Sequence, residues 1–281
     1  MILSGAGNFF TVIDNRTDAQ TQDYYSKNAI SLTISEGKQT DGIIILNASG
    51  SCAFSVWFVN PDGTSGMMCG NGGRCSIYAA IKYGFIEGYE DDTSIAFEVN
   101  GKQYTGKRVA RNLYSIYFSP AAEYPKQVPL LENVALLGDS YKKGHFCGYY
   151  VDVGNDQYVL EVANVDEIDV NGLGKFIRYD KQFEPNGTNV NFYSYSLANN
   201  LIALRTYERG VERETGACGT GAIAAALVHI KKRGYHNMPI TILPTSQSTL
   251  TVDLVLQSGA DSGNVFDRIE NIVLTGEVSE V

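Results

Sequence analysis

Two cysteines, Cys69 and Cys218, head near-identical segments of this chain. The first segment reads MCGNGGRCSIYAA from Met68, and the second reads ACGTGAIAAA from Ala217. A cysteine placed where the chain turns into a helix meets the positive end of the helix dipole and several backbone N–H groups, which favour thiolate over thiol. The repeated context therefore indicates two ionisable thiols that present themselves to one ligand.

A simpler interpretation is that these are small buried residues, because free cysteine is commonly buried and inert. The repetition of Cys-Gly-x-Gly favours the functional interpretation, since glycine allows the backbone to approach a ligand. Cys75, within the first helical run, and Cys52, in an expected strand, are interpreted as core residues. Cys147 is left open, with a core position favoured.

The elements that must position the two thiols are helices predicted over 71–83 and 219–232, the second ending at Gly234. Both are apolar nearly all round, which predicts helices buried inside their domains. A polar helix is predicted over 165–179. Strands are predicted at 9–13, 29–34, 43–46, 54–59, 94–99, 102–110, 113–118, 148–153, 158–162, 189–194, 201–207, 240–243, 249–256 and 272–277.

This pattern predicts an α/β (α+β) protein of two similar domains, each a strongly curved sheet or barrel around its central helix. We expect the first domain over 1–120, joined by the last strand at 272–281, and the second over 121–271. The inter-domain passage is expected near the start of 121–143, a mixed stretch with two prolines. The active site is expected in the cleft between the domains.

Composition narrows the class of protein. The 281 residues are 44% hydrophobic and 19% charged, which is ordinary for globular domains. A net charge of −9 argues against nucleic acid or an anionic membrane as the main partner and is compatible with a small zwitterion. With no long apolar run and no signal-like start, we expect a cytoplasmic protein. Five cysteines without a secretion signal predict free thiols rather than a disulfide framework.

Other catalytic sets have little support. Only three histidines are present, and no Cys/His spacing resembles a zinc ligand set, so no metal is expected. His229 and His236 stand among basic residues near the end of the second central helix, where a cation suits the dipole. The GAGN at Gly5 begins a GxG but follows almost no strand, which disfavours a dinucleotide site.

Several segments, in order, resemble the diaminopimelate epimerase family, a group of cofactor-independent amino-acid epimerases: GAGNFFTVID, DGIIIL, NPDGTSGMMCGNGGRC, VDVGN, NGTNVNF and RTYERGVERETGACGTGA. The resemblance implies that Cys69 and Cys218 are acid/base thiols on opposite faces of the substrate α-carbon, with Asn8 beside it. It also implies that backbone N–H groups hold the α-carboxylate, namely those of Gly70, Asn71, Gly219 and Thr220.

The far end of the substrate would be held by a second set of residues. By resemblance, Glu208 binds the distal ammonium group, and the distal carboxylate is held by Asn60, Asn155, Asn189 and Arg209. The resemblance further implies no cofactor, a role in lysine and peptidoglycan precursor supply, and a possible homodimer.

The chain departs from the family pattern at three places. The common GNPH is replaced by GNDQ at 154–157, the loop after ERG is one residue longer at 211–215, and GIGAD becomes GKQTD at 37–41. These departures bear on substrate preference and remove neither thiol. Three alternatives stay open: a two-cysteine racemase or epimerase of proline, hydroxyproline or histidine, a non-catalytic amino-acid binder, and a redox protein that forms a Cys69–Cys218 disulfide.

Overall fold

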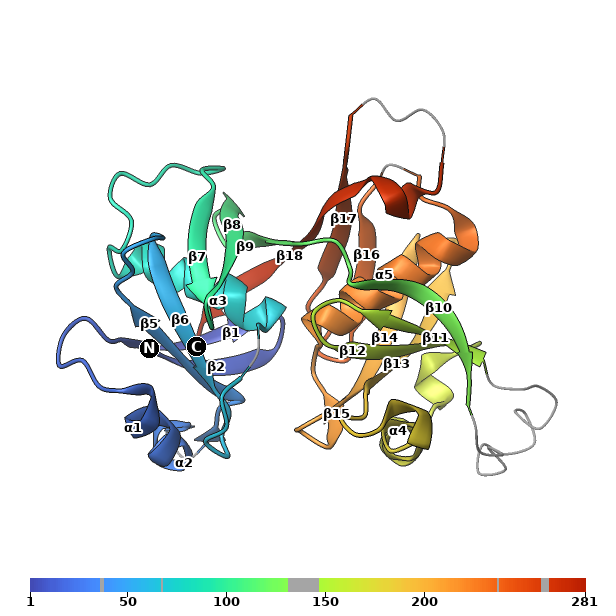
Figure 1. Ribbon diagram of the computed structural model, residues 1–281, viewed down its shortest axis with the longest axis horizontal. Helices are drawn as coiled ribbons and strands as arrows, with labels where there is room; N and C mark the ends of the chain where they lie inside the picture. Colours follow the sequence, from blue (N-terminus) through green and yellow to red (C-terminus); the bar gives the residue numbers. More distant parts are fainter. Residues whose placement is uncertain (36–37, 67, 131–146, 237, 259–262) are drawn as a thin grey trace. The chain divides into compact units, whose positions relative to one another are not determined.

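A computed structural model describes residues 1–35, 38–66, 68–130, 147–236, 238–258 and 263–281. The chain divides into two compact units (Figure 1). The first contains Met1–Phe118 and Val273–Val281, and the second contains Ser119–Ile272. None of the helices in the described ranges is long and apolar enough to cross a membrane.

The first unit is a closed β-barrel. Its strands follow the order β1 (Ile2–Gly5), β2 (Asn8–Asp14), β5 (Gly42–Asn47), β6 (Phe54–Val59), β7 (Ile95–Val99), β8 (Lys102–Ala110), β9 (Leu113–Phe118) and β18 (Ile269–Glu280). Antiparallel pairing of β18 with β1, with Leu3 opposite Glu280, closes the ring. Closure leaves these strands without an open edge.

Helix α3 (Gly70–Lys82) is enclosed by this barrel and contacts β1, β2, β5, β6, β8 and β9. Its first two turns are buried on every side, which is possible because glycine, alanine and serine keep the helix thin. The prediction of a helix over 71–83 is confirmed to within one residue. Cys69 immediately precedes it.

The connection between β2 and β5 contains α1 (Gln22–Lys27), α2 (Ala29–Leu32), β3 (Ile34–Ser35) and β4 (Lys38–Gln39). The strand predicted at 29–34 is therefore wrong. The β-branched residues of this run suggested a strand, but local bonds decide otherwise: the Thr33 hydroxyl and backbone N–H both donate to the Ala29 carbonyl, and Ile30 remains exposed. The short helix forms because these bonds need no distant partner.

The second unit is a curved sheet in the order β18, β17 (Leu250–Leu256), β16 (Ile240–Pro244), β14 (Leu201–Glu208), β13 (Asn189–Ser196), β12 (Asp156–Glu161), β11 (Cys147–Asp152) and β10 (Glu123–Pro129). Strand β15 (Arg213–Thr215) pairs with β14. Strand β10 was not predicted, because prolines at 125 and 129 disfavour a strand. The sheet accommodates Pro125 at a register shift between Glu123 and Lys126, where no regular ladder bond is required.

Helix α5 (Gly219–Arg233) is buried from Gly219 to Ile230 and contacts strands β10 to β14 and β17. The helix predicted over 219–232 is confirmed, and it ends at Gly234. On the sheet, α4 (Val170–Arg178) packs against β13, β14 and β15.

The helix predicted over 165–179 is wrong as a single element. A 3-10 turn, η3 (Val165–Glu167), precedes α4, and Ile168 between them is extended. Asn164 and Asp169 each cap the element that follows them, so two local caps outweigh a continuous helical period. Two further 3-10 turns are η4 (Lys181–Phe183) and η5 (Val265–Arg268). The α/β class, with a curved sheet around a central helix in each unit, is as predicted from the sequence.

Candidate active site

Cys69 is the N-cap of α3. Its backbone is extended (φ −108°, ψ 123°), and its Sγ accepts a hydrogen bond from the Gly72 backbone N–H at 3.5 Å. N-cap positions usually hold serine, threonine, aspartate or asparagine, whose oxygens satisfy this N–H. A sulfur in the same place receives the bond and the field of the helix dipole, both of which favour the thiolate.

Cys218 caps α5 with the same geometry. Its backbone angles are φ −113° and ψ 112°, and its Sγ accepts from the Gly221 N–H at 3.3 Å. Cys69 is half-buried, whereas Cys218 is 6% exposed. The two cysteines thus have similar backbone angles, and each sulfur accepts a hydrogen bond from the third residue of its helix.

The glycine at that third position is required by crowding. A Cβ on Gly221 would lie 2.2 Å from Oδ1 of Asn191, and one on Gly72 would lie 2.7 Å from Cε1 of Phe58. Both distances are below van der Waals contact, so only glycine brings the helix start this close to its sheet. The Cys-Gly-x-Gly spacing therefore places each thiol against a packed wall.

In the first unit, the polar partners at the start of α3 are Asn8, which begins β2, and Arg74. The Asn71 Nδ2 donates to Oδ1 of Asn8 at 2.8 Å, and the Asn71 Oδ1 accepts from Arg74 Nη2 at 2.8 Å. Arg74 Nη1 also donates to the Gly70 carbonyl at 3.3 Å. Asn8 is thereby connected to the first turn of α3.

Arg74 is a fully buried cation. Burial lowers the pKa of its guanidinium to about 10, while attraction to Cys75 and Cys69 opposes that shift. The same proximity means that the cation favours the anionic form of Cys69. Cys75 is fully buried, as predicted, and burial raises its pKa to about 12, so it remains a thiol at neutral pH.

The other two cysteines differ from the expectation of core positions. Cys52 lies in a bend before β6 and is half-buried, so its placement in a strand was wrong. Cys147 begins β11 and is also half-buried. All five cysteines lie in the described ranges, and none of them forms a disulfide bond. Among the described residues, no three His, Cys, Asp or Glu side chains are arranged to hold a metal ion.

In the second unit, Cys218 is joined to a network of buried polar side chains. The Thr220 Oγ1 lies 3.5 Å from the Cys218 Sγ and accepts from Gln157 Nε2 at 3.0 Å and from Asn155 Nδ2 at 3.3 Å. Gln157 Nε2 also donates to the Asn155 Oδ1 at 2.8 Å. Asn155 therefore contacts the neighbour of the second thiol, and Gln157, which bonds to both Asn155 and Thr220, is fully buried.

Asn189, which begins β13, and Arg209, which follows β14, form a second group near Asp156 at the start of β12. The Arg209 backbone N–H donates to Asn189 Oδ1 at 2.9 Å, and the Asn189 Nδ2 donates to the Asp156 carbonyl at 3.1 Å. The Arg209 Nη1 donates to Asp156 Oδ2 at 2.8 Å and to the Gly187 carbonyl at 3.1 Å. The guanidinium of Arg209, the amide of Asn189 and the carboxylate of Asp156 thus converge at one end of the sheet.

Glu208 and Asn60 lie outside these two groups. Glu208 ends β14, and its carboxylate accepts from the Thr215 hydroxyl of β15. Asn60 is exposed in the turn after β6, and its Nδ2 donates to the Thr64 Oγ1 at 2.9 Å. Each unit therefore contains one cysteine that caps a helix, together with its own set of polar residues.

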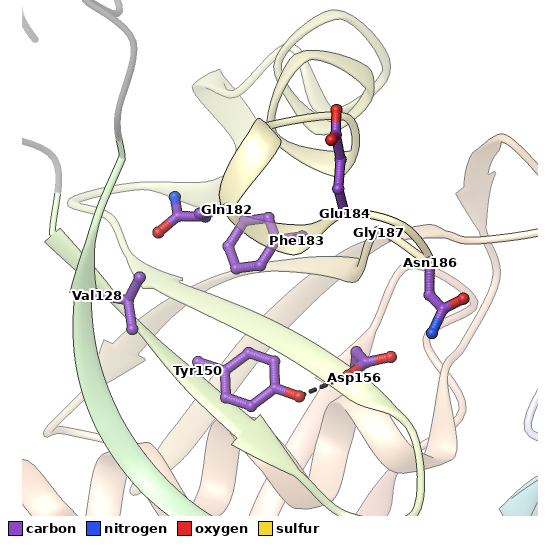
Figure 2. A pocket seen from close by; sticks show the side chains of 8 residues that line it. All are labelled: Val128, Tyr150, Asp156, Gln182, Phe183, Glu184, Asn186 and Gly187. Carbon is purple, nitrogen blue, oxygen red and sulfur yellow. Dashed lines mark hydrogen bonds between the residues drawn. The ribbon is translucent and has the colours of Figure 1, made fainter.

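Beside Arg209 the second unit has a cavity of about 330 Å³ (Figure 2). Its lining includes Asp156, whose Oδ1 accepts from the Tyr150 hydroxyl, and Phe183, whose ring stacks on Tyr150 at 6.4 Å between centroids. Gly187, which accepts from Arg209, also lines it.

Comparison with known proteins places this architecture in a family. The family model described as diaminopimelate epimerase matches residues 149–277. Diaminopimelate epimerase of Chlorobaculum tepidum is 33% identical over 89% of this chain and 90% of the relative. That of Aquifex aeolicus is 29% identical over 99% of this chain and 94% of the relative. This chain belongs to the diaminopimelate epimerase family. It is accordingly an isomerase, and the resemblance seen in its segments is confirmed.

Solved structures support the fold of this family member. A Bacillus anthracis phenazine biosynthesis protein of the PhzF family has a TM-score of 0.72 at 14% identity and covers 100% of this chain and 95% of its own. A hydroxyproline epimerase from Agrobacterium vitis with bound trans-4-OH-L-proline has a TM-score of 0.71 at 14% identity, covering 100% and 90%. At this identity the likeness shows the fold alone.

Three residues that sequence analysis did not assign to the site are joined to it in this epimerase family member: Arg74, Gln157 and Asn191. An arginine inside an otherwise small and apolar helical run was a visible signal for Arg74. Gln157 was visible only as a departure from the family pattern. Asn191 gave no signal, because nothing in the sequence of β13 distinguishes it from an ordinary polar strand residue.

Proposed function

We propose that this protein interconverts L,L-diaminopimelate and meso-diaminopimelate without a cofactor, by moving the α-proton between two thiols. The observation that carries the proposal is the repeated N-cap, in which Cys69 and Cys218 each accept the N–H of the third helical residue. The names of the relatives supply the substrate. The product would serve lysine and peptidoglycan precursor biosynthesis.

In this mechanism one cysteine, as thiolate, removes the α-proton, and the other, as thiol, delivers a proton to the opposite face of the carbon. The electron pair left by the broken C–H bond forms the new C–H bond, so charge and protons balance over one turnover. One thiolate and one thiol are needed together, and the pair therefore titrates as a coupled unit. The two thiols exchange roles when the reaction runs in reverse.

The carbanion must be stabilised by the protein. The first N–H groups of a helix have no acceptor within the helix and point toward an anion at its start. We assign the α-carboxylate to the first helical residues, Gly70, Asn71, Gly219 and Thr220. Their N–H dipoles are fixed before the reaction, which is the condition for electrostatic stabilisation of developing charge.

The distal end of the substrate is assigned to the polar group of the second unit. Within the described ranges, Arg209 is held by Asp156 and Gly187 through Nη1, and its backbone N–H donates to Asn189. The remaining guanidinium nitrogens suit a carboxylate, and Glu208 suits an ammonium group. Asn155 and Asn60 complete the set that we assign to the distal group.

Asp156 favours a second candidate, an epimerase or racemase for an amino acid without a distal carboxylate. Its carboxylate already pairs with Arg209 at 2.8 Å, so it competes with a second carboxylate for the same cation. Proline, hydroxyproline and histidine lack that group. We place this candidate second because Arg209, Asn189 and Glu208 would then have no ligand.

The test is α-hydrogen exchange in deuterium oxide, followed by proton NMR on the reduced protein. L,L-Diaminopimelate, L-proline, trans-4-hydroxy-L-proline and L-histidine are compared side by side. Exchange with diaminopimelate alone is expected, and the Cys69→Ala and Cys218→Ala variants should each lose epimerisation. A single-cysteine variant with wild-type turnover would refute the two-thiol mechanism. Exchange only with another amino acid would retain the mechanism and overturn the substrate, and no exchange would favour a binder.

A further inference from the structure

The hydroxyl group of Thr220 is the direct neighbour of the Cys218 sulfur, at 3.5 Å. The distance alone leaves open which of the two is the donor. Thr220 Oγ1 also receives two N–H bonds, from Gln157 at 3.0 Å and from Asn155 at 3.3 Å. A hydroxyl has two acceptor sites and one proton. With both acceptor sites occupied, the proton of Thr220 is directed to the sulfur.

The orientation of these amides is fixed by a group that can only accept. The Asn191 Nδ2 lies 3.3 Å from the backbone carbonyl of Tyr158, so that end of the amide must be its NH₂. The same Nδ2 donates to Gln157 Oε1 at 2.8 Å, while the Asn191 Oδ1 accepts from the Thr206 hydroxyl at 2.9 Å. Gln157 must therefore present its NH₂ to Thr220.

The members of this chain of bonds are held in one arrangement by burial. Gln157 and Asn191 are 0% exposed, Thr206 is 3% exposed and Thr220 is 6% exposed. A reversed amide would bring donors against donors in a site without solvent, at the cost of unpaired buried polar groups. Residues of β12, β13 and β14 thus determine the direction of a bond at the start of α5.

We infer that Gln157 is a positioning residue that orients the Thr220 hydroxyl to donate to Cys218 and thereby favours the thiolate of Cys218. A donor placed on the charged form of an acid lowers its pKa. The inference rests on the proposed function only for the use of Cys218 in catalysis. Gln157 itself donates to Asn155 and Thr220 and accepts from Asn191.

The first unit lacks this hydroxyl. Asn71 occupies the place of Thr220, and its amide is engaged by Asn8 and Arg74. Cys69 therefore has a buried cation nearby, whereas Cys218 has a neutral hydroxyl donor. Cys69 consequently serves as an internal control for any change made at Thr220 or Gln157.

Charged groups around α5 are engaged elsewhere. At the start of the helix, Asp156 of β12 pairs with Arg209 and Glu208 of β14 accepts from Thr215. At its end, Glu161 of β12 pairs with Lys232 and Arg233. Other titratable residues on the strands that contact α5 are Glu123, Tyr124, Lys126, Cys147, Tyr149, Tyr150, Asp152, Tyr158, Tyr193, Tyr195, Arg205, Tyr207 and Asp253. Variants that leave all of them unchanged isolate the contribution of the hydroxyl.

The experiment is a pH titration of protein labelled with carbon-13 at the cysteine Cβ, which needs no reagent to reach the buried sulfur. The five cysteine signals are assigned with single Cys→Ser variants. In Thr220→Val the hydroxyl is lost at nearly constant shape, and we expect the Cys218 pKa to rise by about one unit. Thr220→Ser keeps the hydroxyl and should titrate as the wild type does. Gln157→Met should shift Cys218 in the same direction as Thr220→Val.

An unchanged Cys218 pKa in Thr220→Val would overturn the inference. So would an equal shift in Thr220→Ser, because packing and not the hydroxyl would then be responsible, or an equal shift at Cys69, because the effect would not be local. If Gln157→Met fails to fold, the two Thr220 variants decide alone. The α-hydrogen exchange assay on the wild type is separate, so loss of the proposed activity leaves the titration interpretable.

Discussion

His229, one turn before the end of α5, should make the protein less stable on mild acidification. Its ring is 6% exposed and lies 4.3 Å from the Tyr195 ring, and its Nδ1 is buried without a partner among the described residues. Burial is the largest cause that lowers the pKa of the imidazole from 6.5 to about 4, and Arg233 adds to it. Glu161 opposes the shift, and it is already paired with Arg233.

The direction in which stability changes with pH follows from proton linkage. The unfolded chain binds a proton at His229 near pH 6.5, and the folded chain does so only near pH 4. Between these values the unfolded state holds more protons, so stability is fully present above pH 6.5 and is lost as the pH falls toward 4. A difference of about 2.5 units corresponds to about 3 kcal/mol, because one unit is about 1.4 kcal/mol.

The assay is urea unfolding followed by far-ultraviolet circular dichroism, at pH values from about 4.5 to about 7.5, on the wild type and His229→Leu. Leucine has a similar volume, favours helix and binds no proton. Carboxylates that titrate in this range contribute to both proteins and cancel in the difference. We expect the wild type to lose about 2 to 3 kcal/mol more than the variant over this range. Parallel stability curves would refute the reasoning.

Three further predictions concern the site. Gly221→Ala should lower the free energy of unfolding by about 2 to 3 kcal/mol, because the new Cβ would lie 2.2 Å from a buried amide oxygen. Gly50→Ala is the control: nothing lies within 4 Å of its Cβ, so it should unfold at the wild-type urea midpoint. Asp156→Ala should lower KM for diaminopimelate about fivefold, since Arg209 is released from a partly exposed ion pair worth about 1 kcal/mol; a raised KM would contradict this. Arg74→Met should change the free energy of unfolding by less than about 2 kcal/mol, because relief from burying the cation offsets its lost hydrogen bonds. The rate of α-hydrogen exchange should nevertheless fall about tenfold. A decrease of more than about 4 kcal/mol in the free energy of unfolding would contradict this prediction.

The elements that carry the thiols were predictable because their determinants are local. The two Cys-Gly-x-Gly starts, the small apolar runs and the stop at Gly234 define α3 and α5 to within a residue. The strand predicted at 29–34 and the single helix at 165–179 failed for the same kind of reason. There, the bonds from Thr33 to the Ala29 carbonyl and the caps by Asn164 and Asp169 override the pattern, and such local bonds are visible in sequence only when the element boundary is already known.

The surroundings of the thiols were not predictable to the same degree, because they depend on which residues the sheet brings together. Gln157, Asn191 and Thr206 lie on three strands, and only the pairing of those strands makes one network. His229 shows the same limit: its place at the end of a helix suggests a cation, but burial among strands gives the neutral form. The position of His229 along its helix was readable, whereas the burial of its side chain among strands was not.

The differences between the two halves are as informative as their repetition. Two-base stereoinversion needs one thiolate and one thiol at the same pH, and two identical caps would give both sulfurs the same proton affinity. The second helical residue differs, Asn71 in one half and Thr220 in the other, and so do the groups behind it, a buried Arg74 and a buried Gln157. The backbone therefore repeats the cap in both halves, and under the proposed mechanism the side chains packed behind it would set the pKa of each thiol separately. Exchanging Asn71 and Thr220 should change the pKa values of both cysteines and leave both helices intact.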